Sequence, residues 1–376
     1  MSQADPTSTI DFAMLGHPDS YDHIGDLFLH SRPDYNPDKL KKYKATLLKF
    51  FEWTPSYISK THLDIRASDG RALSGRLIIC TFLPEMINSP KQMMTAYQKT
   101  RDACRLAQEA GAKVIGLGGF TSIVGGTQGE GLAEEFQLAV TSGNSLTAAL
   151  ALAQLDGLLQ RLNWSLERRT VAVIGASGDI GRACTMALAH RVQKILLIAR
   201  NRSKLESVRC GLPANVEVYL DTDARSAIEA DVIIAATSSS EPILAEADLR
   251  SGTIVCDIGY PKNLAYAPNP RPDVLVFSAG LAEMPFELDI QYYTRLPTPR
   301  ILYGCFSEAM VLALAGRYEN FSIGQGRISL EKMDTILALA HTHGFEPAPL
   351  YRGKIPLTDA YLDVFLRQVK PHQVIR

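Results

Sequence analysis

The sequence lacks any apolar run long enough to cross a membrane. Its longest apolar stretches, such as residues 77–86 and 309–316, fall far short of the roughly 18 residues that a membrane-spanning helix needs. Residues 1–12 contain neither the basic segment nor the apolar segment of a secretory signal peptide. These absences exclude an integral membrane protein and predict a cytoplasmic one.

An excess of positive charge is also absent. Lys and Arg together number 39 and Asp and Glu 40, so the formal net charge is −1. A general nucleic-acid-binding protein usually carries a basic excess, and the sequence therefore argues against that class. The six cysteines are scattered, with no C-x-x-C pair among them. This argues against a disulfide framework and against a zinc ribbon, so no metal site is expected.

The composition is that of a globular protein: 46% of the 376 residues are hydrophobic and 21% are charged. This length allows two or three domains. The first part mixes helix and strand signals. Helical spacing of apolar residues predicts helices near residues 40–51, 90–110 and 146–162. A hairpin is expected within residues 63–82, and a strand at residues 113–117.

The middle of the chain alternates strand and helix signals regularly. Continuous apolar runs separated by helix signals predict a parallel sheet that is buried on both faces. The predicted strands are residues 170–174, 195–199, 216–220, 232–236, 253–256 and 274–277. We therefore expect an α/β protein with a doubly wound parallel Rossmann sheet. The expected parts are an N-terminal α/β substrate domain (1–165), the Rossmann domain (166–298) and a mainly helical C-terminal segment (299–376).

The first Rossmann strand ends in a glycine-rich loop between strand and helix. The loop has the pattern G-x-x-G-x-x-G and contains Gly175, Ser177, Gly178, Asp179, Ile180 and Gly181. The first glycine permits a tight turn, the second lets the backbone approach a pyrophosphate, and the third lets the helix pack closely. The helix N-terminus then offers N–H groups to the phosphates. The loop predicts a dinucleotide site, and the alternative is a glycine-rich turn in another kind of α/β protein.

The second strand indicates which dinucleotide binds. A strand that serves NAD ends in Asp or Glu, which binds the ribose hydroxyls. Here the strand is followed by Arg200, Asn201 and Arg202. Cations at this position suit a 2′-phosphate, so the prediction is NADPH, although the same residues could be solvated surface charges.

Two further strand ends belong to the same expected site, because ligands lie beyond the carboxyl ends of parallel strands. Thr237 and Ser238 follow the fourth strand, where small residues can lie against a nicotinamide ribose. Gly259 and Lys262 follow the fifth. Lys262 could polarise a substrate carbonyl or stabilise an oxyanion, and it could equally be a surface lysine.

Cys305 is the candidate nucleophile. The Tyr-x-x-x-Lys pair of short-chain dehydrogenases is missing, and no Cys, His and Glu set has zinc-ligand spacing. Cys305 follows Gly304 at the start of an apolar helix, and a helix N-terminus lowers a thiol pKa. A thiolate can attack a thioester to give an acyl-enzyme, which hydride then reduces to an aldehyde. The alternative is a buried cysteine that packs as a small hydrophobe.

The chain resembles the long-chain fatty acyl-(acyl carrier protein) reductases best known from cyanobacteria. The resemblance extends from about residue 12 to about residue 347. It rests on residues 14–17, 82–86, 117–124, 141–145, 175–181, 196–202, 259–263, 305–309, 320–322 and 343–345. It implies that Cys305 is the acylated nucleophile and that acyl carrier protein or coenzyme A delivers the substrate. In cyanobacteria the product feeds an aldehyde-deformylating oxygenase.

Two small motifs of the first part are candidates for the acyl site. Gly118, Gly119 and Ser122 follow a predicted strand, and Asn144 precedes a predicted helix. Ser122 and Asn144 could donate hydrogen bonds to a thioester carbonyl, or the two motifs could be a plain turn and a helix cap.

Two segments carry candidate contacts with partners. Five lysines without an intervening acid, at positions 39, 41, 42, 44 and 49, could dock an acidic carrier protein or simply be solvated. Tyr361, Phe365 and Val369 recur at helical spacing and could cover the core, a partner subunit or a membrane surface. A fatty product suggests at most peripheral membrane contact.

The predicted function is NADPH-dependent reduction of a long-chain acyl thioester to an aldehyde through Cys305. Two alternatives stay open. The first is an NADP-dependent alcohol or hydroxy-acid dehydrogenase of the shikimate-dehydrogenase type, which would not need Cys305. The second is a non-catalytic protein that senses NADPH or binds a carrier. Only the reductase uses both the glycine loop and the Cys305 helix.

Overall fold

The computed structural model describes residues 9–21, 23–24, 27, 42–67, 69–125 and 129–369. The chain forms two compact units, and each is built from separate segments. Unit 1 comprises Met1–Gly143, Met284–Gln325 and Ala338–Glu346, and unit 2 comprises Asn144–Glu283, Gly326–Leu337 and Pro347–Arg376. The predicted boundaries after residues 165 and 298 therefore fall inside a unit, one in unit 2 and one in unit 1.

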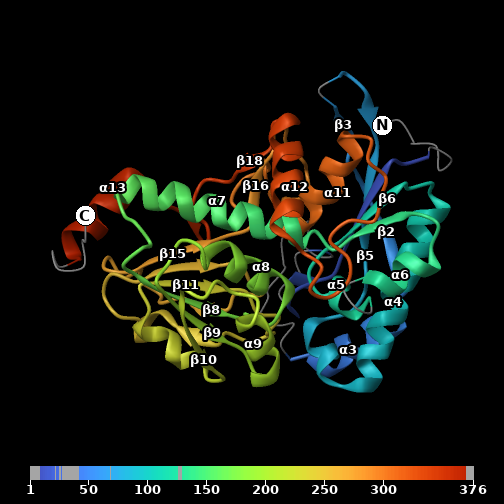
Figure 1. The fold of residues 1–376 in the computed structure, drawn as a ribbon. Helices are drawn as coiled ribbons and strands as arrows, with labels where there is room; N and C mark the ends of the chain where they lie inside the picture. Colours follow the sequence, from blue (N-terminus) through green and yellow to red (C-terminus); the bar gives the residue numbers. More distant parts are fainter. Residues whose placement is uncertain are drawn as a thin grey trace. The chain divides into compact units, whose positions relative to one another are not determined.

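Six parallel strands form the sheet of unit 2, in the order β10-β9-β8-β11-β13-β15 (Figure 1). They are β8 (Thr170–Ile174), β9 (Lys194–Ile198), β10 (Glu217–Asp221), β11 (Val232–Ala235), β13 (Ile254–Asp257) and β15 (Leu275–Ser278). This is the doubly wound Rossmann order, in which the direction of winding reverses between the first and fourth strands. The predicted fold class is confirmed, and each predicted strand lies within one residue of the observed one.

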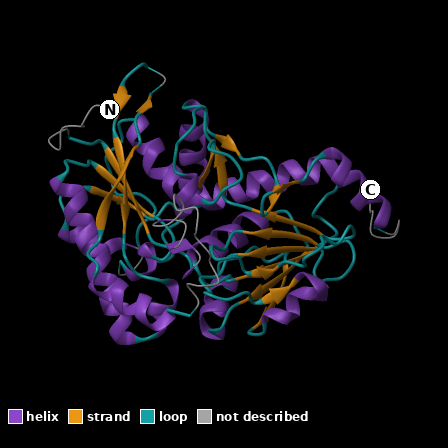
Figure 2. Cartoon of the chain, turned by 180° about the vertical axis from the view of Figure 1, so that it is seen from behind, coloured by secondary structure: helices purple, strands orange, loops and turns teal. Residues whose placement is uncertain are grey.

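Both faces of this sheet are buried, which explains why its strands are continuously apolar. Val171 and Val173 of β8 belong to one core cluster, whereas Ala172 and Ile174 belong to a second cluster. Successive side chains of a strand point to opposite faces, so a sheet covered on both sides needs apolar residues at every position. Figure 2 shows helices beside the strands of each sheet.

The helices of unit 2 begin with α7 (Asn144–Leu162), which contacts α8 (Asp179–Leu188). The remaining elements of the unit are short. They are α9 (Arg202–Arg209), η3 (Ala224–Glu229), β12 (Leu244–Ala245), η4 (Glu246–Asp248), β14 (Leu264–Ala265), β16 (Leu281–Glu283), β19 (Tyr351–Arg352), β20 (Ile355–Pro356) and α13 (Asp359–Gln368). α12 (Leu330–Thr342) begins in unit 2 and ends in unit 1, and β18 (Glu346–Pro347) lies at their last junction.

The C-terminal helix α13 covers the core of unit 2. Phe365 and Val369 are buried in the same cluster as β8, and Tyr361 packs against it. The Phe365 ring lies 5.6 Å from the ring of Trp164, between centroids. Of the three roles that the sequence left open for this helix, packing on the core is the one observed.

The sheet of unit 1 has five strands, in the order β2-β5-β1-β6-β7. They are β1 (Phe12–Gly16), β2 (Tyr57–His62), β5 (Gly75–Ile79), β6 (Val114–Leu117) and β7 (Ala139–Thr141). All pairs are parallel except β2 with β5. The predicted hairpin is confirmed and begins earlier than expected: β3 (Ile65–Arg66) pairs with β4 (Ala72–Leu73), and β2 pairs antiparallel with β5 beyond them. On its other side, β5 pairs with β1.

Two helices cover opposite faces of the unit 1 sheet. Ile115 and Leu117 of β6 pack in the cluster that contains residues of α4 (Pro90–Glu109). Between them, Gly116 faces α11 (Gly304–Leu314), where a Cβ atom would lie 2.9 Å from that of Ala309. The other elements of the unit are α3 (Lys44–Trp53), η1 (Pro84–Asn88), α5 (Thr121–Val124), α6 (Glu130–Glu135), α10 (Gln291–Thr294) and β17 (Ile301–Tyr303).

The predicted C-terminal segment contains less helix than expected. Residues 300–345 contain β17, α11 and α12, and residues 315–329 between the two helices are not helical. Among the helices of the described ranges, none combines the length and apolar character that crossing a membrane requires.

Candidate active site

Cys305 occupies the second position of α11, in unit 1. Every other residue of this helix is buried, whereas Cys305 is partly exposed. The helix begins there because Tyr303 is extended, with ψ near 137°, and the following residues turn directly into helix. The sequence prediction that Cys305 lies at a helix N-terminus is therefore confirmed.

Glycines of the strand ends let α11 approach the sheet of unit 1 closely. A Cβ atom on Gly118 would lie 2.3 Å from the Phe306 ring, and one on Gly143 would lie 2.1 Å from the Cα of Cys305. Gly143 also has a φ of +70°, which side chains rarely adopt. The predicted substrate residues Gly118 and Gly119 thus lie beside Cys305, in contact with the first turn of its helix.

The expected low pKa of the thiol is not observed. Burial raises the pKa of Cys305 to about 11, although the backbone amides of Gly119, Phe306 and Cys305 itself lower it, and the charge of Glu308 raises it further. Desolvation of the charged form therefore outweighs the helix N-terminus. The amides nevertheless supply donors for a negative charge on this sulfur or on a nearby oxyanion.

A buried carboxylate lies one turn along α11. Glu308 is fully buried and accepts a hydrogen bond from the Thr141 hydroxyl, whose oxygen in turn accepts from the Gly143 N–H at 3.1 Å. This chain of bonds joins β7, the Gly143 turn and α11 below Cys305. The sequence analysis gave Glu308 no role, because a glutamate in an apolar helix has no local signal beyond its own polarity.

The hydroxyl of Ser122 is used within its own loop. It donates to the Gly119 carbonyl at 3.0 Å, and Thr121 donates to the Gly118 carbonyl at 2.8 Å. These bonds stabilise the turn into α5, which is the alternative that the sequence left open for this motif.

Asn144 lies in unit 2, and its side chain approaches Asp179 at the start of α8. Asp179 is buried and accepts a hydrogen bond from the Gly326 N–H at 2.7 Å. Burial raises the pKa of Asp179, against the effect of the Gly326 and Asn144 donors. Asn144 therefore belongs to the surroundings of the glycine loop in the structure.

The glycine loop of unit 2 has the geometry of a dinucleotide cradle. Gly175 has a φ of +86°, and a Cβ atom there would lie 2.3 Å from the carbonyl of Ala236, while one on Gly181 would lie 2.2 Å from that of Gly175. A Cβ on Gly178, by contrast, would meet only the Gly175 carbonyl, at 3.3 Å. The first and third glycines are thus required by packing, and the second, whose Cβ would meet a single backbone atom, lets a phosphate group approach the backbone because it has no side chain.

The start of α8 also suits an anion. Its N-cap residue, Gly178, has no side chain to occupy the N–H groups of the first turn. Ser177 and Ile180 are partly buried in the same loop. The residues present therefore fit a bound dinucleotide.

Exposed cations follow β9. Arg200 and Arg202 are both exposed, and Asn201 caps α9 by accepting a hydrogen bond from the Lys204 N–H at 3.0 Å. The capping role of Asn201 was not predicted, and it fixes the direction in which the chain leaves the strand.

The loops after β11 and β13 are joined by one buried side chain. Asn263 accepts a hydrogen bond from the Thr237 N–H at 2.8 Å and donates to the Thr237 carbonyl at 3.3 Å. Its own N–H donates to buried Asp257 at 3.2 Å. Asn263 also fills the space beside Gly259. Ser238, next to Thr237, is exposed. The sequence analysis missed the role of Asn263, which only its burial reveals.

Lys262 is partly buried rather than a free surface lysine. Its Nζ donates to the Asp257 carbonyl at 3.0 Å and lies 3.6 Å from the centroid of the Tyr260 ring. Burial lowers the pKa of Lys262, but Tyr260, Asp257 and Tyr266 outweigh it and raise the pKa above its ordinary value. The side chain is therefore a fixed positive charge beyond the end of β13.

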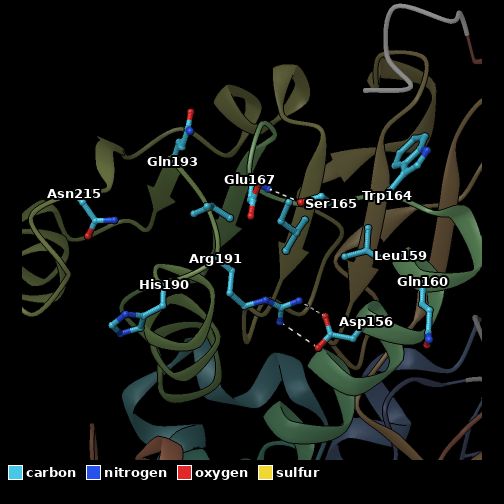
Figure 3. Close-up of a pocket in the computed structure, with 12 residues that line it drawn as sticks. Asp156, Leu159, Gln160, Trp164, Ser165, Glu167, His190, Arg191, Gln193 and Asn215 are labelled. Atoms are coloured by element: carbon cyan, nitrogen blue, oxygen red, sulfur yellow. Dashed lines mark hydrogen bonds and ion pairs between the residues drawn. The ribbon is translucent and has the colours of Figure 1, made fainter. Parts of the chain in front are cut away.

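A pocket of about 740 Å³ in unit 2 lies away from these residues (Figure 3). Ser165 and Glu167 line it just before β8, Gln193 just before β9 and Asn215 shortly before β10. These are the amino ends of the parallel strands, whereas dinucleotides bind beyond the carboxyl ends. The pocket contains none of the predicted site residues.

Several known proteins are similar to parts of this chain or to nearly all of it. The family model for shikimate / quinate 5-dehydrogenase matches residues 157–278, a range that contains the six strands of the unit 2 sheet. A solved structure, L-tryptophan dehydrogenase from Nostoc punctiforme, aligns with 97% of this chain and 89% of its own at 13% identity, with a TM-score of 0.35. The aminotransferase PigE of a Serratia strain is 32% identical over 64% of this chain and 29% of its own length.

The Rossmann sheet with its glycine loop, together with a reductase relative that spans nearly the whole chain, defines the class of the protein: it is an enzyme, an oxidoreductase. The long-chain acyl-[acyl-carrier-protein] reductase of Synechococcus elongatus is 31% identical over 90% of this chain and 99% of its own length. The chain therefore belongs to the family of long-chain acyl-[acyl-carrier-protein] reductases, as the sequence motifs predicted.

Proposed function

We propose that the protein reduces a long-chain fatty acyl thioester to a fatty aldehyde with NADPH, through a thioacyl intermediate on Cys305. The observation that supports this most directly is the position of that thiol. It is the one residue of α11 that is not buried, and three backbone amides surround its sulfur. A partly exposed sulfur with ready anion donors is the arrangement that acyl transfer needs.

The proposed cycle begins with attack of the Cys305 sulfur on the thioester carbonyl. The carbon–sulfur bond to the carrier breaks, and the carrier thiol leaves with the proton of the Cys305 thiol. In this proposal the amides of Gly119 and Phe306, which approach the Cys305 sulfur, hold the oxyanion of this step. Addition of a hydride to the acyl carbon then breaks its bond to the Cys305 sulfur, which releases the aldehyde and leaves a thiolate, and a proton from water restores the thiol.

NADPH, when bound, supplies the hydride for this reduction. We assign its pyrophosphate to the loop Gly175–Gly181 and its 2′-phosphate to Arg200 and Arg202. The missing side chain of Gly178 at the N-terminus of α8 and the exposure of both arginines support this assignment. Thr237, Ser238, Gly259 and Lys262 would face the nicotinamide half, where the Lys262 charge could stabilise an oxyanion. Arg200→Ser should raise the KM for NADPH about tenfold and leave that for NADH nearly unchanged.

We further propose that acyl carrier protein or coenzyme A delivers the acyl group. Lys42, just before α3, and Lys49, within α3, are both exposed. Their positive charge suits an acidic carrier. Lys39 and Lys41 lie outside the described residues, and only the backbone of Lys44 is described. Charge reversal at Lys42 and Lys49 should raise the KM for the carrier-protein substrate and not that for acyl coenzyme A. A cytoplasmic location and transfer of the aldehyde to a deformylating oxygenase remain parts of this proposal.

The test is NADPH oxidation with palmitoyl- or stearoyl-(acyl carrier protein), together with intact mass without NADPH. Wild type should oxidise NADPH and carry an acyl adduct, and Cys305→Ser should do neither. Cys210→Ser is the matched control, because Cys210 is an exposed cysteine outside the site. Turnover that survives in Cys305→Ser would refute the thioacyl intermediate.

A dehydrogenase of the shikimate type is the second candidate, and the family model over residues 157–278 favours it. It predicts oxidation of an alcohol or hydroxy acid with NADP, and activity that survives alkylation of Cys305. A non-catalytic NADPH sensor predicts cofactor binding with no turnover of any thioester, aldehyde or alcohol. The same protein preparations distinguish all three.

A further inference from the structure

His17, which follows β1 in unit 1, has both ring nitrogens occupied by the backbone. The Phe120 N–H donates to Nε2 at 2.9 Å, and Nδ1 lies 2.8 Å from the carbonyl of Pro18. Because Nε2 accepts a hydrogen bond, the ring proton is on Nδ1, which donates to Pro18. The ring is buried and stacks on Phe82, with centroids 4.6 Å apart.

The same ring lies directly against the loop that faces Cys305. Gly119 has a φ of +58°, and a Cβ atom there would lie 2.7 Å from His17 Nε2. Gly119 is bonded to Phe120, and its own N–H is one of the amides around the Cys305 sulfur. The hydrogen bond to His17 therefore fixes the peptide that follows Gly119, and the glycine lets the imidazole approach.

We propose that His17 is a positioning residue for the nucleophile. Its neutral imidazole accepts the Phe120 N–H and so holds the Gly119 N–H toward the sulfur of Cys305 and toward the oxyanion of the acyl group. This inference rests on the proposed role of Cys305 as nucleophile. It assigns His17 no part as a general base, since the lone pair of Nε2 is already used by Phe120.

The neutral state of the ring is part of the argument. Burial lowers the pKa of His17 to about 4, so the ring carries no charge at neutral pH. Protonation would place a second N–H at Nε2, opposite the Phe120 N–H, and would break the loop contact.

Other groups around the nucleophile do not replace this contact. Glu308 faces Cys305 from α11, and its charge disfavours the thiolate. Tyr293, on α10, donates its hydroxyl to the carbonyl of His17 at 3.3 Å and fills the space beside Gly16. Burial raises the pKa of Tyr293 well above its ordinary value, so it stays protonated. Tyr293 thus anchors the backbone of His17 while the imidazole anchors Phe120.

The test measures the reactivity of Cys305 without any acyl substrate. Full-length protein with Cys210→Ser is treated with iodoacetamide between pH 7 and 11, and alkylation of the peptide that contains Cys305 is followed by mass spectrometry. His17→Leu removes the acceptor for Phe120, and we expect alkylation at pH 8 to slow about tenfold as the pH profile moves upward. His17→Gln offers a carbonyl oxygen as acceptor, and we expect it to stay within about threefold of the parent.

Two results would overturn the proposal. One is a dependence of the Cys305 alkylation rate on pH that is the same in His17→Leu as in the parent, whatever the melting temperature of the variant. The other is a loss in His17→Gln as large as that in His17→Leu. If His17→Leu does not fold, the proposal is tested by the tautomer of His17 in the parent protein. We expect ¹⁵N-histidine spectra to show a protonated Nδ1 and an unprotonated Nε2 from pH 5 to 9. A protonated Nε2 would refute the role. Because no thioester is used, failure here is distinct from failure of the reductase assay.

Discussion

The Cys305 thiol shows how two local effects compete at a single residue. A helix N-terminus favours a thiolate, and the sequence places Cys305 there. Burial opposes the charge and leaves the pKa near 11. The position of the cysteine was thus predictable from a glycine and an apolar helix. The sign of its pKa shift was not, because it depends on how closely Gly118, Gly119 and Gly143 bring other segments around it.

The turn at Gly143 gives the sharpest prediction at this scale. Gly143→Ala places a methyl group 2.1 Å from the Cα of Cys305 at a positive φ, so the helix or the turn must move. We expect a loss of about 2–4 kcal/mol in unfolding free energy, and slower alkylation of Cys305. Urea unfolding and the iodoacetamide assay measure the two effects.

Gly157→Ala is its control. Gly157 lies within α7 with nothing near the added methyl group, so the change should stabilise the protein by about 0.5–1 kcal/mol. Equal losses in the two variants would contradict the argument that the space around Cys305 is what requires Gly143.

Among the elements, the whole unit 2 sheet was predictable, whereas only the hairpin and β6 of the unit 1 sheet were. The strands of unit 2 are continuous apolar runs, and their glycine loop marks the first strand end. In unit 1, β5 is one arm of the predicted hairpin, but its pairing on the other side with β1, more than fifty residues earlier, was not predicted. Such pairing depends on which faces remain to be covered, and no local pattern records it.

The link between the β11 and β13 loops also lies at the element scale. Asn263→Ala removes both hydrogen bonds to Thr237 and leaves the backbone of that loop without its partner. We expect the KM for NADPH to rise about tenfold and the unfolding free energy to fall by roughly 1–3 kcal/mol. Steady-state kinetics and urea unfolding test this. Asn215→Ala, at an exposed site, should change neither. An unaltered KM in Asn263→Ala would separate these loops from the cofactor site.

At the scale of the whole molecule, the buried imidazole makes stability depend on pH. The pKa of His17 is about 4 in the folded protein, against an ordinary value of 6.5. Between these pH values the unfolded chain binds a proton that the folded chain does not, so stability falls as pH drops from about 6.5. The loss reaches roughly 3 kcal/mol at most. Burial raises the pKa of Asp19, but hydrogen bonds and charge from His23 and a hydrogen bond from Ser20 outweigh this effect and lower the pKa to about 2. Protonation of Asp19 therefore extends the loss of stability below pH 4.

The expected measurement is a smaller change in urea unfolding free energy between pH 7 and pH 4.5 for His17→Gln than for the parent protein. The variant lacks the imidazole but keeps Asp19, so its remaining slope should appear mainly at the acid end. The same slope in both proteins would show that other groups control this pH dependence.

The chain passes from one unit to the other more often than the predicted domain boundaries imply. After a first segment in unit 2 the chain returns to unit 1 at residue 284, and after a second it returns at residue 338. Composition and helix signals place boundaries between neighbouring segments of sequence, and they contain no sign that a later helix returns to an earlier sheet.

That return has a consequence for synthesis on the ribosome. The strands β1, β5, β6 and β7 emerge first, but α11, which packs on them, follows only after the whole of the β8–β15 sheet. Until then one face of the first sheet has no helix to cover it, and the nascent protein lacks Cys305. A chain released before Gly304 would therefore contain the strands of both sheets, but one face of the first sheet would be open to aggregation and the core of unit 2 would lack α13. Cys305 reaches its place only after both sheets have been synthesised.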